Sequence, residues 1–217
     1  ASNNTAVGNN AMIANTTGAS NVAVGKNALS NNTTAALNTA VGAYALENNT
    51  TGASNTAVGL QALQDNTTAS NNTAVGLNAL LQNTTGDLNV AIGALALDAN
   101  TVGDRSVAVG YSALGSQNPA SNADMNNTAV GYNAGGGITT GIKNTLIGSV
   151  AGDAITTADN NVAVGMSALG ATTTGANNTA VGQGSLQTNT TASDNTGIGY
   201  SALNQNTTAN DNTSIGH

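Results

Sequence analysis

The sequence predicts an all-β fold, a β-solenoid of about twelve coils with 17 residues each. Three observations lead to this prediction. A short motif recurs at a fixed spacing, the composition lacks the residues that fill a wide core, and Val, Ile and Thr recur on the same schedule as the motif. The chain should therefore be held together by hydrogen-bonded ladders with thin apolar seams.

The recurring motif is N-[TV]-A-[VI]-G, and its glycine runs through the whole chain. The motif glycines are Gly8, Gly25, Gly42, Gly59, Gly76, Gly93, Gly110, Gly131, Gly148, Gly165, Gly182, Gly199 and Gly216. Every interval is 17 residues except that from Gly110 to Gly131, which is 21. Most repeats continue x-x-A-L and then a polar turn such as N-T-T-G. Seventeen residues are too few for a helical hairpin but suit one coil of short strands joined by Gly and Asn turns.

The composition excludes an ordinary globular core. The 217 residues include no Phe, Trp or Cys, one Pro and four Tyr, and 6% are charged. Disorder is the alternative for so polar a chain, but disordered chains lack a strict schedule of β-branched residues. The repeats therefore indicate an ordered fold.

The alternation of side chains within the motif assigns its residues to two faces. Thr or Val and the pre-glycine Val or Ile share one face, and Asn, Ala and Gly share the other. We expect the pre-glycine row, from Val7 to Ile215, to lie inside the coil with the Leu of A-L, although the reverse assignment remains open. One coil then buries about three large apolar side chains worth about 1.5–3 kcal/mol each. Because ordering each residue costs about 1–2 kcal/mol, we expect coils to be stabilised by lateral association.

We expect one repeat domain with an irregular middle. It consists of regular coils 4–114, an inserted loop 115–125, variant coils 126–160 and regular coils 161–216. An insertion that keeps later repeats in register should bulge outward. The candidate exposed loop residues are Gln117, Asn118, Pro119, Asn122 and Asp124. Both ends stop inside a repeat, which suggests a fragment of a longer fibre.

The variant coils exchange apolar volume between two positions. Gly135 and Gly152 stand where other coils have Leu, and Ile138 and Ile155 stand where other coils have the turn Asn. We expect both Ile side chains to point inward and refill the core.

The motif resembles the head repeat of YadA-like trimeric autotransporter adhesins. The longer form N-T-A-V-G-x-x-A-L-x-x-N-T-T-G is similar to repeats of bacterial surface proteins and phage tail-fibre-like proteins. The resemblance covers nearly the whole chain, and it implies a left-handed β-roll, a homotrimer of parallel chains, and attachment at a cell or virion surface. The 17-residue spacing is longer than that of the adhesin heads.

Charge and hydropathy limit the partners. The net charge is −7 and the only cationic side chains are Lys26, Arg105 and Lys143, so we expect no nucleic-acid partner. No apolar run is long enough to span a bilayer, so we expect no membrane insertion in this segment. The resemblance implies an extracellular, cell-surface or virion location. A glycan or protein receptor on a host surface would fit such a rod.

No residue pattern predicts catalysis, a cofactor or a metal. The lone His217 has no partner to orient it, and the motif glycines lack the helix and Lys-Ser/Thr of a phosphate loop. Carboxylates recur on neighbouring coils, as in Asp87 with Asp104 and Asp194 with Asp211, but the calcium-binding nonapeptide is absent. The N-x-T triplets match glycosylation acceptors, yet turn chemistry explains them more simply.

The position after each motif glycine forms what we name the contact stripe. Its large apolar members are Leu60, Leu77, Tyr111, Tyr132, Met166 and Tyr200. They are candidates for contact with a partner or between chains. The sequence therefore predicts a non-enzymatic structural or adhesive rod. A filament subunit stacking end to end is the alternative, and an ice-binding solenoid is less favoured because Val22, Val90, Val107 and Val162 interrupt the strand Thr row.

Overall fold

The computed structural model describes residues 1–216 and is all-β, with no helix among them. It is a parallel β-solenoid of about twelve coils with about 17 residues per turn, as the repeat predicts. His217 lies outside the described residues. The chain forms two compact units. The N-terminal unit holds Ala1–Arg105 and Asn118–Ala123, and the C-terminal unit holds Ser106–Gln117 and the residues from Asp124 onward.

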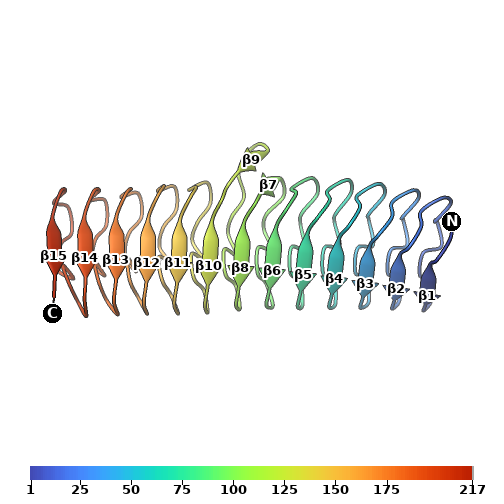
Figure 1. The fold of residues 1–217 in the computed structure, drawn as a ribbon, viewed down its shortest axis with the longest axis horizontal. Helices are drawn as coiled ribbons and strands as arrows, with labels where there is room; N and C mark the ends of the chain where they lie inside the picture. Colours follow the sequence, from blue (N-terminus) through green and yellow to red (C-terminus); the bar gives the residue numbers. More distant parts are fainter. Residues whose placement is uncertain (217) are drawn as a thin grey trace. The chain divides into compact units, whose positions relative to one another are not determined.

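The N-terminal unit carries six short parallel strands. They are β1 (Thr5–Val7), β2 (Val22–Val24), β3 (Thr39–Val41), β4 (Thr56–Val58), β5 (Thr73–Val75) and β6 (Val90–Ile92). Each strand pairs with the strand one repeat later, so Val41 lies opposite Val58, which lies opposite Val75 (Figure 1). A two-residue strand β7 (Gly103–Asp104) pairs with β9 (Ala123–Asp124).

The C-terminal unit repeats the same arrangement. Its strands are β8 (Val107–Val109), β10 (Thr128–Val130), β11 (Thr145–Ile147), β12 (Val162–Val164), β13 (Thr179–Val181), β14 (Thr196–Ile198) and β15 (Thr213–Ile215). Strands β8 and β10 pair with Val109 opposite Val130. The longer interval therefore leaves the motif in register, as expected.

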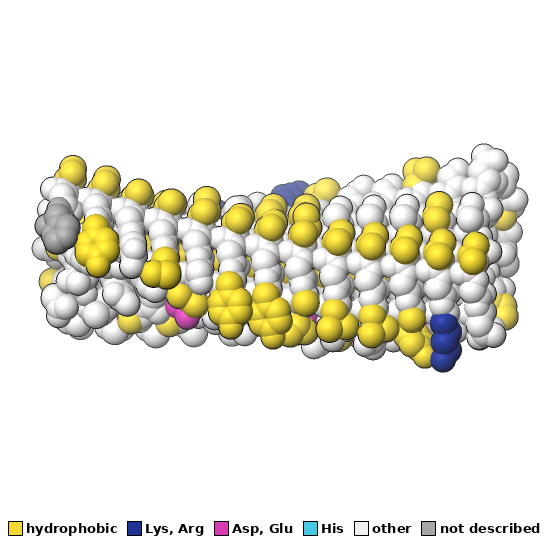
Figure 2. Space-filling view, turned by 90° about the horizontal axis from the view of Figure 1, so that it is seen from below, with side chains coloured by type: hydrophobic (Ala, Val, Ile, Leu, Met, Phe, Trp, Pro, Cys, Tyr) yellow, Lys and Arg dark blue, Asp and Glu magenta, His cyan; other side chains and the backbone are white. Residues whose placement is uncertain are grey.

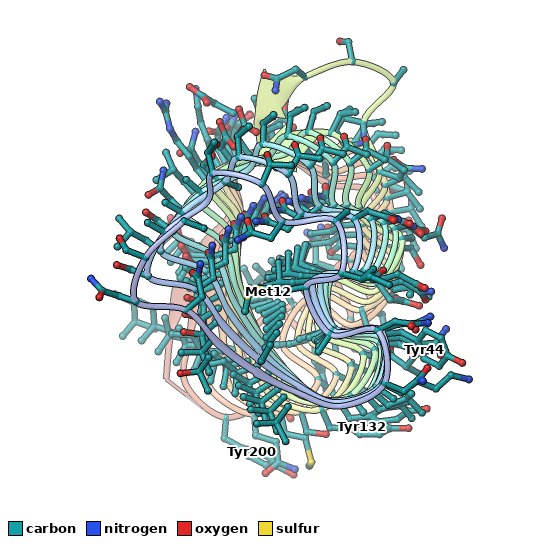
Figure 3. The ribbon with its side chains drawn as sticks, turned by 90° about the vertical axis from the view of Figure 1, so that its right-hand side faces the viewer. Met12, Tyr44, Tyr132 and Tyr200 are labelled. Atoms are coloured by element: carbon teal, nitrogen blue, oxygen red, sulfur yellow. The ribbon has the colours of Figure 1, made fainter. Side chains whose placement is uncertain are left out.

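The interior is lined by Ala and Leu, not by the pre-glycine Val and Ile. The central Ala of the strands, for example Ala40 and Ala57, is fully buried, as are Leu46 and Leu63 of the A-L pair. Met12 occupies the same place as these leucines and points into its coil in Figure 3. The expected interior row from Val7 to Ile215 is wrong: these side chains lie on the outside of the sheet, since Leu side chains reaching across a thin coil leave room for only a methyl group on the strand.

Buried asparagines form two ladders that hold coil to coil. In the motif ladder, the Asn55 backbone N–H donates to Oδ1 of Asn38 at 2.9 Å, and Asn55 Nδ2 donates to the Ala69 carbonyl at 2.8 Å. In the turn ladder, Asn66 Nδ2 donates to Oδ1 of Asn49 at 2.8 Å and to the Ala69 carbonyl at 3.0 Å. Because buried amides are costly unless bonded, these ladders explain the fixed Asn positions.

The motif glycine allows neighbouring coils to approach backbone to backbone. Gly76 has φ +136°, and a Cβ on it would lie 2.6 Å from the carbonyl carbon of Gly93. No side chain fits there without moving a strand, so this row is confined to Gly.

The variant coils refill their core as expected, with one addition. Ile138 and Ile155 are fully buried. Leu146 replaces the usual strand Ala in β11 and is also buried. A Cβ at Gly135 would lie 2.7 Å from Leu146 Cδ1, so Leu146 fills the space that the missing Leu side chains leave.

The insertion is less exposed than expected. Asn118, Asn122 and Asp124 are exposed, but Gln117 is fully buried and Pro119 is buried, which corrects the prediction for those two residues. Gln117 stands at a turn-ladder position, where its Oε1 accepts from Ser106 Oγ at 3.1 Å and from Asn127 Nδ2 at 3.0 Å. Gln117 thus joins the two ladders where Ser106 replaces the motif Asn.

Candidate functional site

The exposed apolar side chains gather on the outer side of the strands. Of the fifteen large apolar side chains exposed among the described residues, all but Ile13 belong to three rows. One row is the pre-glycine Val and Ile, one is the contact stripe, and the third is the position before the motif Asn, with Leu37 and Leu88. We name the strand Thr/Val row, the pre-glycine row and the contact stripe together the outer sheet face. Figure 2 shows apolar side chains in rows that run from coil to coil.

Every large apolar member of the contact stripe is exposed. In the N-terminal unit Leu60 and Leu77 are 45% and 47% exposed. In the C-terminal unit the exposed members are Tyr111, Tyr132, Met166 and Tyr200. Tyr132 and Tyr200 point away from their coils in Figure 3. The stripe therefore lies beside the pre-glycine row and extends the same apolar surface, separated from it only by the glycines.

Two tyrosines of the stripe stack on each other. The ring centroids of Tyr111 and Tyr132 are 5.6 Å apart and the ring planes are 10° from parallel. The pairing of β8 with β10 brings these residues to adjacent coils although 21 positions separate them in sequence.

The outer sheet face carries almost no charge. Lys26 is the one charged residue in its three rows among the described residues, and its ammonium lies 5.2 Å from the centroid of the Tyr44 ring. The interaction with the Tyr44 side chain raises the pKa of Lys26. None of the ten carboxylates of the chain lies in these rows. The negative charge is confined to other walls of the coils.

Several carboxylates cap backbone groups of the preceding coil. Asp87 Oδ1 accepts from the Ser70 N–H at 2.6 Å, and Asp104 Oδ1 accepts from the Asp87 N–H at 2.7 Å. Asp159 does the same for Ile142 at 2.8 Å. These recurring acids satisfy backbone donors. In residues 1–216, no group of three or more His, Asp or Glu is placed to hold a metal ion.

Two other carboxylates are partly withdrawn from water. Burial is the largest cause that raises the pKa of Asp98, and the same holds for the pKa of Asp153. Backbone hydrogen bonds oppose the shift in both. Each of the two acids lies five residues after its motif glycine, so neither belongs to the rows of the outer sheet face.

In the inner coils, the asparagines of the N-T-T triplets are not accessible acceptors for a glycan, whereas Asn15 and Asn206 near the chain ends are half-buried. Asn49 and Asn66 are fully buried, and Asn66 Nδ2 makes two hydrogen bonds. A sugar on this nitrogen would break the turn ladder, so the triplets serve the fold.

No pocket opens on the surface of residues 1–216. Within the same residues there is no helix with the length and apolar character needed to cross a membrane.

No family model, curated protein or solved structure matches this chain. Twelve of the fifteen exposed large apolar side chains among the described residues lie on the outer sheet face.

Proposed function

We propose that the chain is a non-enzymatic structural and adhesive rod of an extracellular fibre on a cell or virion surface. Copies associate side by side through the outer sheet face, as a trimer of left-handed β-rolls of the kind that the N-T-A-V-G repeat suggests. The observation that carries the proposal is a nearly uncharged, apolar and regular face on a chain of net charge −7.

The sign and placement of charge favour a second copy as the occupant. Two acidic chains repel each other wherever their carboxylates meet. The outer sheet face is the surface on which copies can approach without placing carboxylates against each other, because its rows hold none. A cationic partner would instead be attracted to the walls that carry the acids.

The size of the face suits a weak to standard protein interface. Five residues across the strand, glycine and stripe span about 16 Å, and each coil adds about 4.8 Å. Summed over the six and seven coils of the two units, the face covers on the order of 1,000 Å² by these spacings. A stable interface buries about 800 Å² on each partner.

The adhesive part of the proposal follows from repetition. Identical coils present the same side chains many times, so weak contacts with a glycan or protein receptor add through avidity. Asn31, Asn48 and Asp65, each six residues after a motif glycine, offer such repeated polar groups. Asn31 Nδ2 donates to Asn48 Oδ1 at 3.1 Å, and Asn48 Nδ2 donates to Asp65 Oδ1 at 3.2 Å.

Light scattering of the purified chain tests the association. We expect a mass of three chains, and a melting temperature that rises with protein concentration. Val58→Lys places a charge in the pre-glycine row and should lower the mass to that of one chain. Thr68→Lys, in an exposed turn, is the matched control and should not. A wild-type chain that is well folded at the mass of one chain would contradict the proposal.

A second candidate function, ice binding, uses the same face. The strand Thr or Val and the pre-glycine Val share one outward, half-buried face in strict register, as for Thr56 and Val58 beside Thr73 and Val75. Such a flat array can order water. A thermal-hysteresis assay separates the two functions, since a face buried between copies cannot bind ice.

A further inference from the structure

Tyr111 and Tyr132 are arranged as a reactive pair. They are two of only four tyrosines in the chain, and they are 50% and 58% exposed. Their rings are stacked with centroids 5.6 Å apart, within the range of offset stacking. Both rings belong to the C-terminal unit.

The backbone fixes the two residues beside each other. The Gly131 N–H donates to the Val109 carbonyl at 2.8 Å, just before the two tyrosines. The Asn133 N–H donates to the Tyr111 carbonyl at 2.9 Å, just after them. These bonds hold the two Cα atoms at the coil spacing, so the rings meet without loss of further chain entropy.

We propose that Tyr111 and Tyr132 form a site of oxidative modification, at which the two rings couple into an intrachain dityrosine. The oxidant is hydrogen peroxide acting through a haem peroxidase. Because both rings come from one chain, the coupling itself needs no second copy, and it takes place on a chain whose contact stripe is not covered by another copy.

The coupling balances as a two-electron oxidation. Each phenol loses one electron and one proton, which gives two phenoxyl radicals, and the peroxide takes up both electrons and both protons to become two waters. A carbon–carbon bond then forms between one ortho carbon of each ring. Each ring regains aromaticity when its ortho hydrogen moves, as a proton, to the phenolic oxygen. Stacked rings suit this step because the new bond forms nearly perpendicular to both ring planes.

Few other residues compete for the oxidant. The chain has no Cys and no Trp. Met12 and Met125 are buried, and Met166 is the exposed methionine whose oxidation to the sulfoxide is the main side reaction. The other two tyrosines are placed differently from the stacked pair. Tyr44 lies against Lys26, and the stripe position one coil before Tyr200 is held by Gln183, which is not a tyrosine.

The bond would join the coils of β8 and β10. These are the coils at which Ser106 replaces the motif Asn and Gln117 joins the two ladders. A covalent link there would hold the irregular coil to its neighbour.

The test uses the whole chain with peroxidase and peroxide, and reads dityrosine fluorescence, intact mass and the cross-linked peptide. The variant Tyr44→Phe/Tyr200→Phe keeps only the stacked pair, and Met166→Leu removes the competing thioether. We expect both variants to lose two hydrogens per chain and to yield a peptide joining Tyr111 to Tyr132, at a yield that does not change on dilution. Tyr132→Phe should lose this product.

Two results would overturn the proposal. One is a Tyr44→Phe/Tyr200→Phe chain that gives no dityrosine while free tyrosine in the same reaction does. The other is a product that joins separate chains only and disappears on dilution. Circular dichroism of the Tyr132→Phe chain, expected to match the parent, separates loss of the ring from loss of the fold.

Discussion

Asparagine is the residue on which the coil depends most. Asn38, Asn55 and Asn72 lie in a fully or almost fully buried row, and each donates its backbone N–H to the amide oxygen one coil before. Turn propensity explains why Asn is favoured in such a repeat, but it does not predict burial. The signal in the sequence is that Asn stands four residues before twelve of the thirteen motif glycines, all except Gly110, at a position where a solvated turn would accept Ser, Asp or Gly more often.

Removing one amide of the turn ladder should destabilise the fold strongly. In Asn66→Ala, Asn49 Oδ1 and the Ala69 carbonyl lose a donor and Asn83 Nδ2 loses an acceptor. Since each unsatisfied buried group costs about 1–3 kcal/mol, we expect a loss of about 3 kcal/mol in the free energy of unfolding. Urea denaturation followed by circular dichroism measures it. The exposed neighbour Thr68→Ala is the control, and an equal effect of the two would show that the ladder contributes little.

The carboxyl of Asp153 should make stability depend on pH. Its pKa is raised in the folded chain because of burial, so the folded state holds the proton more tightly than the unfolded state. Stability therefore falls as the pH rises from the unfolded pKa of 3.8 through the folded value, and it stays reduced above that. Asp153→Asn should be more stable than the parent at neutral pH and equal to it below pH 3.8, with a small gain because water screens a half-exposed group. Thermal melts across this range test the sign, with the exposed Asp211→Asn as control.

At the scale of one strand, the sequence predicts the position but not the side that faces inward. The alternation within T-A-V assigns Thr and Val to one face and Ala to the other, and both assignments satisfy it. The space inside the coil decides between them. Leu46 and Leu63 already fill it from the facing wall, which leaves room only for Ala40 and Ala57 on the strand. A wider core would need large apolar side chains on the inward strand face. This core is thin, so the inward position is held by Ala.

The variant coils offer a direct measure of this packing. Ile138 is fully buried where other coils have the turn Asn. Ile138→Asn should cost about 2–4 kcal/mol, because it removes apolar burial beside Gly135 and Leu146 and introduces a polar amide there. Ile142→Asn, at a half-buried site in the same coil, should cost clearly less. Denaturation curves of both variants under one set of conditions give the comparison, and equal midpoints would contradict the assignment of Ile138 to the core.

At the scale of the whole chain, the repeat predicts nearly all of the fold and little of the site. The spacing of the motif predicts the solenoid, its coil length and the register across the insertion. The register is fixed because each motif glycine must lie against the next one, as Gly76 lies against Gly93, and a shifted strand would bring a side chain into that contact. The contact stripe is identified from its position in the repeat. The sequence does not predict that the stripe continues the apolar surface of the pre-glycine row, because this depends on which strand face lies outside. The partial burial of the insertion also escaped prediction, since a Gln in place of a turn Asn carries no obvious signal.

Association through the outer sheet face should respond to salt with a defined sign. The rows of the face contain no carboxylate, so no ion pair between copies is there to be screened. Salt instead screens the repulsion between chains that each carry a net charge of −7. We therefore expect sedimentation to show tighter association as the salt concentration rises from about 0.01 to 0.15 M, over which the screening length falls from about 30 to 8 Å. Dissociation by added salt would indicate that charged side chains hold the copies together.

The hydrogen bonds between coils also determine how a unit responds to a pulling force. Bonds such as that from the Gly59 N–H to the Val41 carbonyl link one coil to the next, so a force along the stack loads them one coil at a time. A unit stretched from its ends should peel, each coil yielding in turn at a similar low force. Each event should lengthen the chain by about 50–55 Å, which is 17 extended residues less the coil spacing. Such a unit would then behave as an extensible tether that absorbs load in equal steps.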